Sequence, residues 1–238
     1  MYIAQFDTIN TFQEAPSMRN KRYGHCSAYI GDTLYVTGGF DHQDTETTVP
    51  STLVTCEAYN EEKGKWRKIN DLQRPVAFAA IATFKQECFY VFGGFEDYST
   101  VDLIQKYDPS IDEWTIMKVK LPVRLAKMGA ANIEDETILI VGGIYEDVNS
   151  DNPLSLISNA YKLNLKKMTW SKAAKMKNKR TLNSIMYFFD SQIYALGSSN
   201  NGACEKYDYE VNRWINIPSY DEILPQNDLQ SFSVCMYE

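Results

Sequence analysis

The sequence predicts an all-β fold built from four copies of one unit of about 50 residues, each contributing four short strands. The first observation behind this prediction is a β-branched and aromatic run that ends in glycine and recurs four times. The second is that each run is followed by a strand carrying a tyrosine and then by a tryptophan. The glycine-ended runs are LYVTGG at Gly38, FYVFGG at Gly93, ILIVGG at Gly142 and IYALGS at Gly197, with spacings of 55, 49 and 55 residues.

The tyrosines and tryptophans have a regular spacing within each unit. The tryptophan follows the tyrosine after 7 residues in the first, second and fourth units and after 9 residues in the third. The pairs are Tyr59 and Trp66, Tyr107 and Trp114, Tyr161 and Trp170, and Tyr207 and Trp214. Large rings of this kind fill the space between packed sheets, and glycine lets one backbone approach another closely. We therefore predict that these residues serve the fold.

An arginine opens the apolar run that begins each unit. These arginines are Arg22, Arg74, Arg124 and Arg180. A unit then contains the strand after the arginine, the glycine-ended strand, the tyrosine strand and the tryptophan strand. Four strands in about 50 residues are typical of one β-propeller blade. We predict a single domain over residues 1–238, with blades at about 22–70, 74–119, 124–174 and 180–218.

This pattern resembles the kelch repeat, in which an arginine, a Gly-Gly pair, a Glu-x-Tyr-Asp strand and a tryptophan follow in that order. The resemblance covers nearly the whole chain and implies a kelch-type β-propeller with four complete four-stranded blades. A partial blade shared by the two termini is also expected, with outer strands from residues 1–15 and a first strand from residues 228–238. Three arrangements are open: a closed five-bladed ring, a fragment of a six-bladed protein, or an open propeller completed by a partner or a second copy.

Composition excludes several classes of function. A net charge of -7 and a pI near 5.0 argue against a nucleic-acid surface, which needs clustered cations. No apolar stretch is long enough to span a membrane, and the start MYIAQFD lacks the features of a signal peptide. The five cysteines form no C-x-x-C pair, so free thiols in a reducing compartment are expected. We predict a cytoplasmic protein, with cytoskeletal and ciliary locations as candidates.

Catalytic chemistry has little support in the sequence. The chain has two histidines, His25 and His42, and neither belongs to a cluster with metal-ligand spacing. We therefore predict no catalytic, cofactor-binding or metal-binding residues. The alternative is a propeller enzyme, either a sugar mutarotase or a protein similar to an oxidase.

The resemblance implies a non-catalytic scaffold that binds another protein, with a cytoskeletal or ubiquitin-ligase component as candidate partner. In kelch proteins the arginine position and the residues after the glycine pair lie on the same face. The matching positions of this sequence are therefore predicted to bind a partner. These eight residues are Arg22, Arg74, Arg124, Arg180, Phe40, Phe95, Tyr145 and Asn200.

Each of these assignments has a structural alternative. The arginines would tie one blade to the next through backbone carbonyls, and Phe40 and Phe95 would plug local gaps. The loops after the glycines are also acidic, so their carboxylates would neutralise the arginines and favour a basic or mixed-charge partner. These carboxylates are Asp41, Asp44, Glu46, Glu96, Asp97, Asp102, Glu146, Asp147 and Asp151.

Overall fold

The computed structural model of the protein confirms the predicted all-β fold. It describes residues 2–5, 11–41, 50–134, 136–147, 153–181, 186–189, 192–195 and 204–217, and within these ranges there is no helix. Each predicted unit between residues 22 and 218 contains one four-stranded antiparallel sheet. The glycine-ended strands of the first three units are buried along almost their whole length, as expected for sheets that pack on both faces.

The four sheets share one strand order, in which the first strand lies at one edge and the tryptophan strand at the other. The first sheet contains β4 (Cys26–Ile30), β5 (Thr33–Thr37), β7 (Cys56–Asn60) and β8 (Lys65–Ile69). The second contains β9 (Ala80–Phe84), β10 (Cys88–Phe92), β13 (Ile104–Asp108) and β14 (Glu113–Ile116). The third contains β16 (Gly129–Glu134), β17 (Thr137–Val141), β20 (Ala160–Asn164) and β21 (Thr169–Ala173). The fourth contains β22 (Met186–Phe189), β23 (Gln192–Ala195), β24 (Cys204–Asp208) and β25 (Arg213–Ile217).

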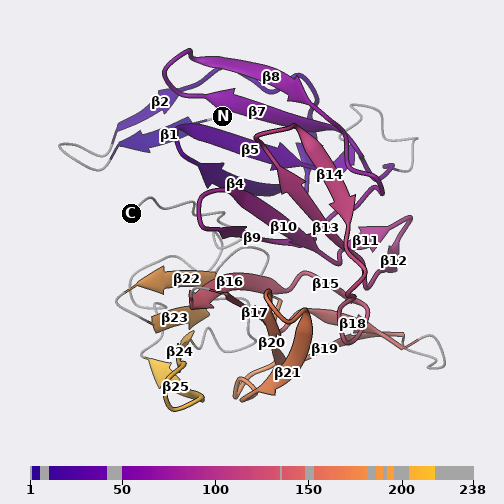
Figure 1. Ribbon diagram of the computed structural model, residues 1–238, viewed down its shortest axis with the longest axis vertical. Helices are drawn as coiled ribbons and strands as arrows, with labels where there is room; N and C mark the ends of the chain where they lie inside the picture. The colour runs from indigo at the N-terminus through magenta and orange to yellow at the C-terminus, as the bar shows by residue number, and fades with distance from the viewer. Residues whose placement is uncertain are drawn as a thin grey trace.

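The first strands of successive sheets lie next to one another, as they do around a propeller axis. Strand β9 contacts β4 on one side and β16 on the other, and β16 also contacts β22. Figure 1 shows the sheets following one another through the molecule in chain order. Three apolar cores fill the spaces between the first and second, second and third, and third and fourth sheets.

Each tryptophan attaches its sheet to the segment that leads into it. The indole N–H donates to a backbone carbonyl just after the last strand of the preceding unit, at 2.6–2.9 Å. The donor and acceptor pairs are Trp66 to Pro16, Trp114 to Asn70, Trp170 to Lys120, and Trp214 to Ala174. The tryptophans thus act as predicted, at the boundary between successive sheets.

The third sheet corrects one assignment made from the sequence. Tyr59, Tyr107 and Tyr207 each lie directly opposite the tryptophan of their own sheet. In the third sheet the residue opposite Trp170 is Leu163, not Tyr161. This register explains the longer spacing, because Leu163 occupies the tyrosine position and Tyr161 lies two residues earlier on the same face.

The glycine pairs are required by backbone conformation and by the neighbouring unit. Gly38 and Gly39 have φ values of +62° and +96°, where a side chain is strained. A Cβ on Gly38 would also lie 2.3 Å from the carbonyl oxygen of Val76, in the segment that leads to the second sheet. Gly93 repeats this contact with the carbonyl of Leu125, at 2.4 Å.

Near the amino terminus, β1 (Tyr2–Gln5) pairs with β2 (Thr11–Glu14). Residues 228–238 lie outside the described ranges, so the partial blade and the closure of the ring stay predictions. Four of the cysteines, Cys26, Cys56, Cys88 and Cys204, are buried, and none of them forms a disulfide within the described ranges. Burial raises the pKa of the Cys26 thiol to about 12, so it is protonated at neutral pH.

Candidate functional site

The candidate site is the face formed by short strands that extend beyond the large sheets. Figure 1 shows β11, β12, β15, β18 and β19 on one side of the molecule. We call this surface the loop face. Its strands are β3 (Arg22–Tyr23), β6 (Phe40–Asp41), β11 (Phe95–Glu96), β12 (Ser99–Thr100), β15 (Leu125–Ala126), β18 (Ile144–Glu146) and β19 (Leu154–Leu156). Strand β3 pairs with β6, β11 with β12, and β18 with both β15 and β19.

Two of the predicted arginines are buried beneath this face. The guanidinium of Arg22 donates to the carbonyls of Gly38 and Thr55 and forms an ion pair of 3.0 Å with Glu57. Arg180 donates to the carbonyl of Ala195 and forms the equivalent pair of 2.7 Å with Glu205. Both guanidinium groups are fully buried. This geometry favours a structural role for Arg22 and Arg180, in which the guanidinium groups bind backbone carbonyls. In this conformation neither side chain can contact a partner.

The two carboxylates in these pairs also hold the backbone of the arginine segments. Glu57 accepts hydrogen bonds from the backbone N–H groups of Arg19 and Asn20. Glu205 accepts them from Lys177 and Asn178 in the same positions. From the sequence, Glu57 and Glu205 are assigned only to the tyrosine strand. Their recurrence two residues before the tyrosine is the available sign that they bind the arginine segment.

Arg74 and Arg124 do not occupy the same position as Arg22 and Arg180. The backbone N–H of Gly94 binds the carbonyl of Leu125, and that of Gly143 binds the carbonyl of Arg180 in the equivalent contact. Gly39 makes this contact with Val76. Val76 and Leu125 therefore fill the arginine position of the second and third units. Arg74 and Arg124 lie two residues and one residue earlier, and both are exposed.

The carboxylate partner changes together with the arginine. Strand register places Gln105 in the second sheet and Tyr161 in the third at the position of Glu57. Gln105 accepts a hydrogen bond from the backbone N–H of Arg74 and donates one to its carbonyl. A buried arginine thus occurs where a carboxylate is available, and an apolar residue occurs where it is not, as expected from the cost of an unpaired buried charge.

The two exposed arginines brace the β11–β12 hairpin. Arg74 holds Glu96 through two hydrogen bonds of 2.8 Å, a bidentate contact. The guanidinium of Arg124 donates to the carbonyl of Thr100. On the other side, Glu146 accepts hydrogen bonds of 2.8 and 2.9 Å from the N–H and hydroxyl of the buried Thr100. Contact between these arginines and a partner stays a prediction.

The predicted aromatic residues are less exposed than the sequence suggested. Phe40 and Phe95 are 4% and 9% exposed, and they pack with Ala77 and Ala126 in a small cluster beneath the face. Their role as local plugs is therefore favoured, and their assignment as exposed anchors is corrected. Tyr145 is partly exposed, and Asn200 lies outside the described residues.

Three aromatic residues that the sequence did not single out are part of this face. Tyr23 and Tyr98 are 41% and 53% exposed, and each ring stacks on Phe40 with centroids 5.4 Å apart. The Phe78 ring lies 6.3 Å from Tyr23 and 6.1 Å from Phe40, centroid to centroid, and the ammonium group of Lys127 lies 4.5 Å from the Phe78 centroid. Exposed rings on a packed aromatic base are typical anchors of protein interfaces.

Successive units are linked beside these rings by residues in the left-handed conformation. Gly24, Phe78 and Lys127 are each two residues after the arginine position and have φ values of +62°, +51° and +56°. The N–H of Phe78 donates to the carbonyl of Gly24, and the N–H of Lys127 donates to the carbonyl of Phe78. A positive φ is unusual for a bulky residue such as Phe78, and such residues cluster at functional sites.

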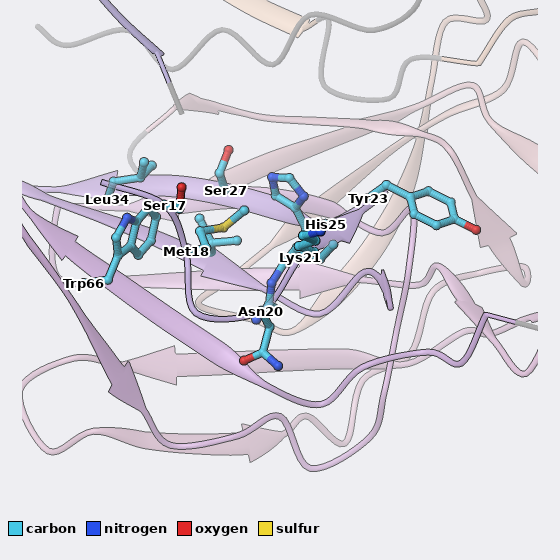
Figure 2. Close-up of a pocket in the computed structure, with 11 residues that line it drawn as sticks. Ser17, Met18, Asn20, Lys21, Tyr23, His25, Ser27, Leu34 and Trp66 are labelled. Atoms are coloured by element: carbon cyan, nitrogen blue, oxygen red, sulfur yellow. The ribbon is translucent and has the colours of Figure 1, made fainter. Parts of the chain in front are cut away.

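A pocket of about 480 Å³ lies against the side of the first sheet that carries Leu34, Val36 and Trp66. Figure 2 shows Met18, Leu34 and Trp66 at one end and His25 towards the other, while Tyr23 points away. In the other three sheets the side equivalent to Leu34 packs against the preceding sheet. This pocket therefore has the position of a boundary between blades.

His25 in this pocket is unsuited to general acid–base chemistry at neutral pH. Burial, with a smaller contribution from the charge of Arg22, lowers the pKa of His25 to about 4. The buried Nδ1 atom has no hydrogen-bond partner within the described part of the chain. Within the described ranges, no three His, Cys, Asp or Glu side chains gather in a metal-binding arrangement.

The strand order, the glycine pairs and the tryptophans at the sheet boundaries define a kelch-repeat β-propeller. The sequence model of the Attractin/LZTR1 beta-propeller family matches residues 2–236, and the chain belongs to this family. None of the described residues forms a helix that could cross a membrane.

Similar proteins include two Kelch-like proteins and one scruin. Kelch-like protein 23 of Mus musculus is 27% identical over 219 residues, which are 87% of this chain and 35% of that protein. Kelch-like protein 25 of Xenopus tropicalis is 27% identical over 224 residues, covering 90% of this chain and 36% of that protein. Alpha-scruin of Limulus polyphemus is 24% identical over 149 residues, covering 62% and 16%. The chain spans about a third of the length of the first two relatives.

Proposed function

We propose that this chain is a non-catalytic interaction module that binds another protein through its loop face. The observation that carries the proposal is the stack of Tyr23 and Tyr98 on the buried Phe40. It presents two exposed rings on a base that is already packed, so little conformational entropy is lost when a partner covers them. The braced hairpin adds to this, because Tyr98 lies at the tip of a hairpin that is fixed at its base.

The enzyme alternative gains no support from the described geometry. The pKa of His25 is lowered to about 4, so this imidazole is a weak base near pH 7 and is poorly matched to general acid–base catalysis. The proposal extends to a cytoplasmic location and to a cytoskeletal or ubiquitin-ligase component as the partner. Fluorescence microscopy of the tagged chain beside cytoskeletal markers tests the location, and a signal confined to a membrane-bounded compartment would contradict it.

Affinity capture with matched variants tests the binding role. The variant Tyr23→Ser with Tyr98→Gly removes both exposed rings of the loop face. The control is Ile111→Ser with Val211→Ser, which removes two side chains that are 62% and 60% exposed on turns of the tryptophan strands. Chemical crosslinking followed by quantitative mass spectrometry measures the captured proteins and their attachment sites.

The expected result is that the same proteins bind the unmodified chain and the control, and that they are depleted at least fivefold with the loop-face variant. Crosslinks should map to residues 95–100 and 144–147. A set of captured proteins that is unchanged in the loop-face variant, with crosslinks on the tryptophan strands, would refute binding through this face.

A further inference from the structure

The cations of the loop face are committed to contacts within the protein. Arg74 is neutralised by Glu96, with a separation of 2.7 Å in their ion pair. Arg124 and Glu146 both contact Thr100, so these opposite charges act on the same residue of the hairpin. The positive charges of Arg74 and Arg124 therefore hold the β11–β12 hairpin in place.

The tip of the braced hairpin presents the opposite chemistry. Strands β11 and β12 pair from Phe95 to Thr100, which leaves Asp97 and Tyr98 as the two turn residues. Both are exposed. The Asp97 carboxylate accepts a hydrogen bond of 3.4 Å from Thr52 and forms no ion pair within the described part of the chain. The tip therefore carries an available negative charge next to an available aromatic ring.

The hairpin also fixes how the Tyr98 ring is presented. One side of the ring stacks on Phe40 at 5.4 Å with an interplanar angle of 26°. The Tyr98 hydroxyl donates to the carbonyl of Pro50, which holds the other end of the side chain. The ring is 53% exposed even though it is held at both ends. A fixed ring beside a carboxylate suits a cation, because the ring face and the carboxylate both attract positive charge.

We infer that the Asp97–Tyr98 tip binds an arginine or lysine side chain from a protein partner. The inference builds on the proposed function and names the chemistry of the partner segment. Charge complementarity supports it, because the chain has a net charge of -7 and the tip is locally anionic. The same face already holds one cation on a ring, since the Lys127 ammonium lies 4.5 Å from the centroid of Phe78.

A library of random 12-residue peptides displayed on phage tests the inference with the purified full chain as target. We expect the enriched peptides to contain arginine or lysine beside an apolar residue, and few carboxylates. Selected peptides are then synthesised with a fluorescent label, and fluorescence anisotropy measures their dissociation constants. Asp97→Asn should weaken binding about three- to tenfold, and Tyr98→Gly about five- to tenfold. Both replacements suit turn positions with φ values of +45° and +69°.

The matched controls lie in the same unit but in its four-stranded sheet: Ile111 is on the turn between β13 and β14, and Glu113 is the first residue of β14. Glu113→Gln removes an exposed carboxylate and Ile111→Ala removes an exposed apolar side chain. Binding should change less than twofold in either control. Binding of the basic peptides should also weaken as the NaCl concentration rises from 50 to 300 mM.

Three outcomes would overturn the inference: enrichment of acidic or purely apolar peptides, no enrichment, or equal weakening by Asp97→Asn and Glu113→Gln. The first is distinguishable from failure of the proposed function. Acidic peptides that still lose binding with Tyr98→Gly would leave the loop face as the binding surface and remove only its basic specificity. Peptides that bind without sensitivity to any loop-face variant would contradict both proposals.

Discussion

Replacing Glu57 with glutamine removes the negative charge that faces the buried guanidinium of Arg22. The two side chains are 2% and 0% exposed and 3.0 Å apart, so water cannot replace the lost partner. Breaking one side of a buried ion pair typically costs about 3–5 kcal/mol. Glu57→Gln should therefore lower the free energy of unfolding by about that amount, a large part of the stability of an ordinary domain. Urea denaturation followed by tryptophan fluorescence measures the change.

The second sheet supplies the matched control for this prediction. Val76 and Gln105 occupy there the positions of Arg22 and Glu57, and both are buried. The double variant Arg22→Val with Glu57→Gln reproduces that neutral pair in the first sheet. We expect the double variant to lose less stability than either single variant, because neither charge is left without a partner. A double variant destabilised by the sum of the two single losses would refute the reasoning.

Three further predictions concern packing, backbone conformation and pH. Trp114→Ala should lower the free energy of unfolding by about 3–5 kcal/mol, because the buried indole packs on Tyr107 and donates to the carbonyl of Asn70. An unchanged midpoint of urea denaturation would contradict its role between sheets. Gly38→Ala should lower the melting temperature well beyond Gly31→Ala, since both have positive φ but only Gly38 would meet a backbone oxygen, and equal losses would contradict this. The pKa of His25 is lowered to about 4, so the unfolded chain binds its proton first and stability falls as pH drops from about 6.5 towards 4. His25→Gln should remove about 2 kcal/mol of the loss between pH 7 and 5, and an unaltered pH dependence would exclude this histidine as its source.

The repeating elements of the fold could be predicted from the sequence because they depend on short-range patterns. Glycine pairs, tryptophans and four strands per unit are visible as residue types at regular spacing. The register of the third tyrosine strand was not, because Tyr161 and Leu163 are two residues apart and lie on the same face of β20. Alternation alone cannot distinguish two apolar residues on one face.

The candidate site was harder to predict because it depends on contacts between units. Arg74 and Arg124 looked equivalent to Arg22 and Arg180, since a shift of one or two residues in a connecting segment hardly changes the spacing of the repeat. The carbonyl contacts of Val76 and Leu125 are needed to see the difference. The exposure of Tyr98 likewise depends on the β11–β12 hairpin, whose two turn residues have no glycine to mark them.

At the left-handed residues Gly24, Phe78 and Lys127, the main-chain hydrogen bonds are kept from unit to unit while the side chains differ. Their main-chain hydrogen bonds keep neighbouring units together, yet the three side chains are as different as a hydrogen atom, an aromatic ring and an ammonium group. The scaffold thus tolerates dissimilar chemistry at equivalent sites on one surface. A Cβ on Gly24 would lie 2.9 Å from the Phe78 ring, so changing the side chains of Phe78 and Lys127 is the direct route to propellers with altered recognition and the same architecture.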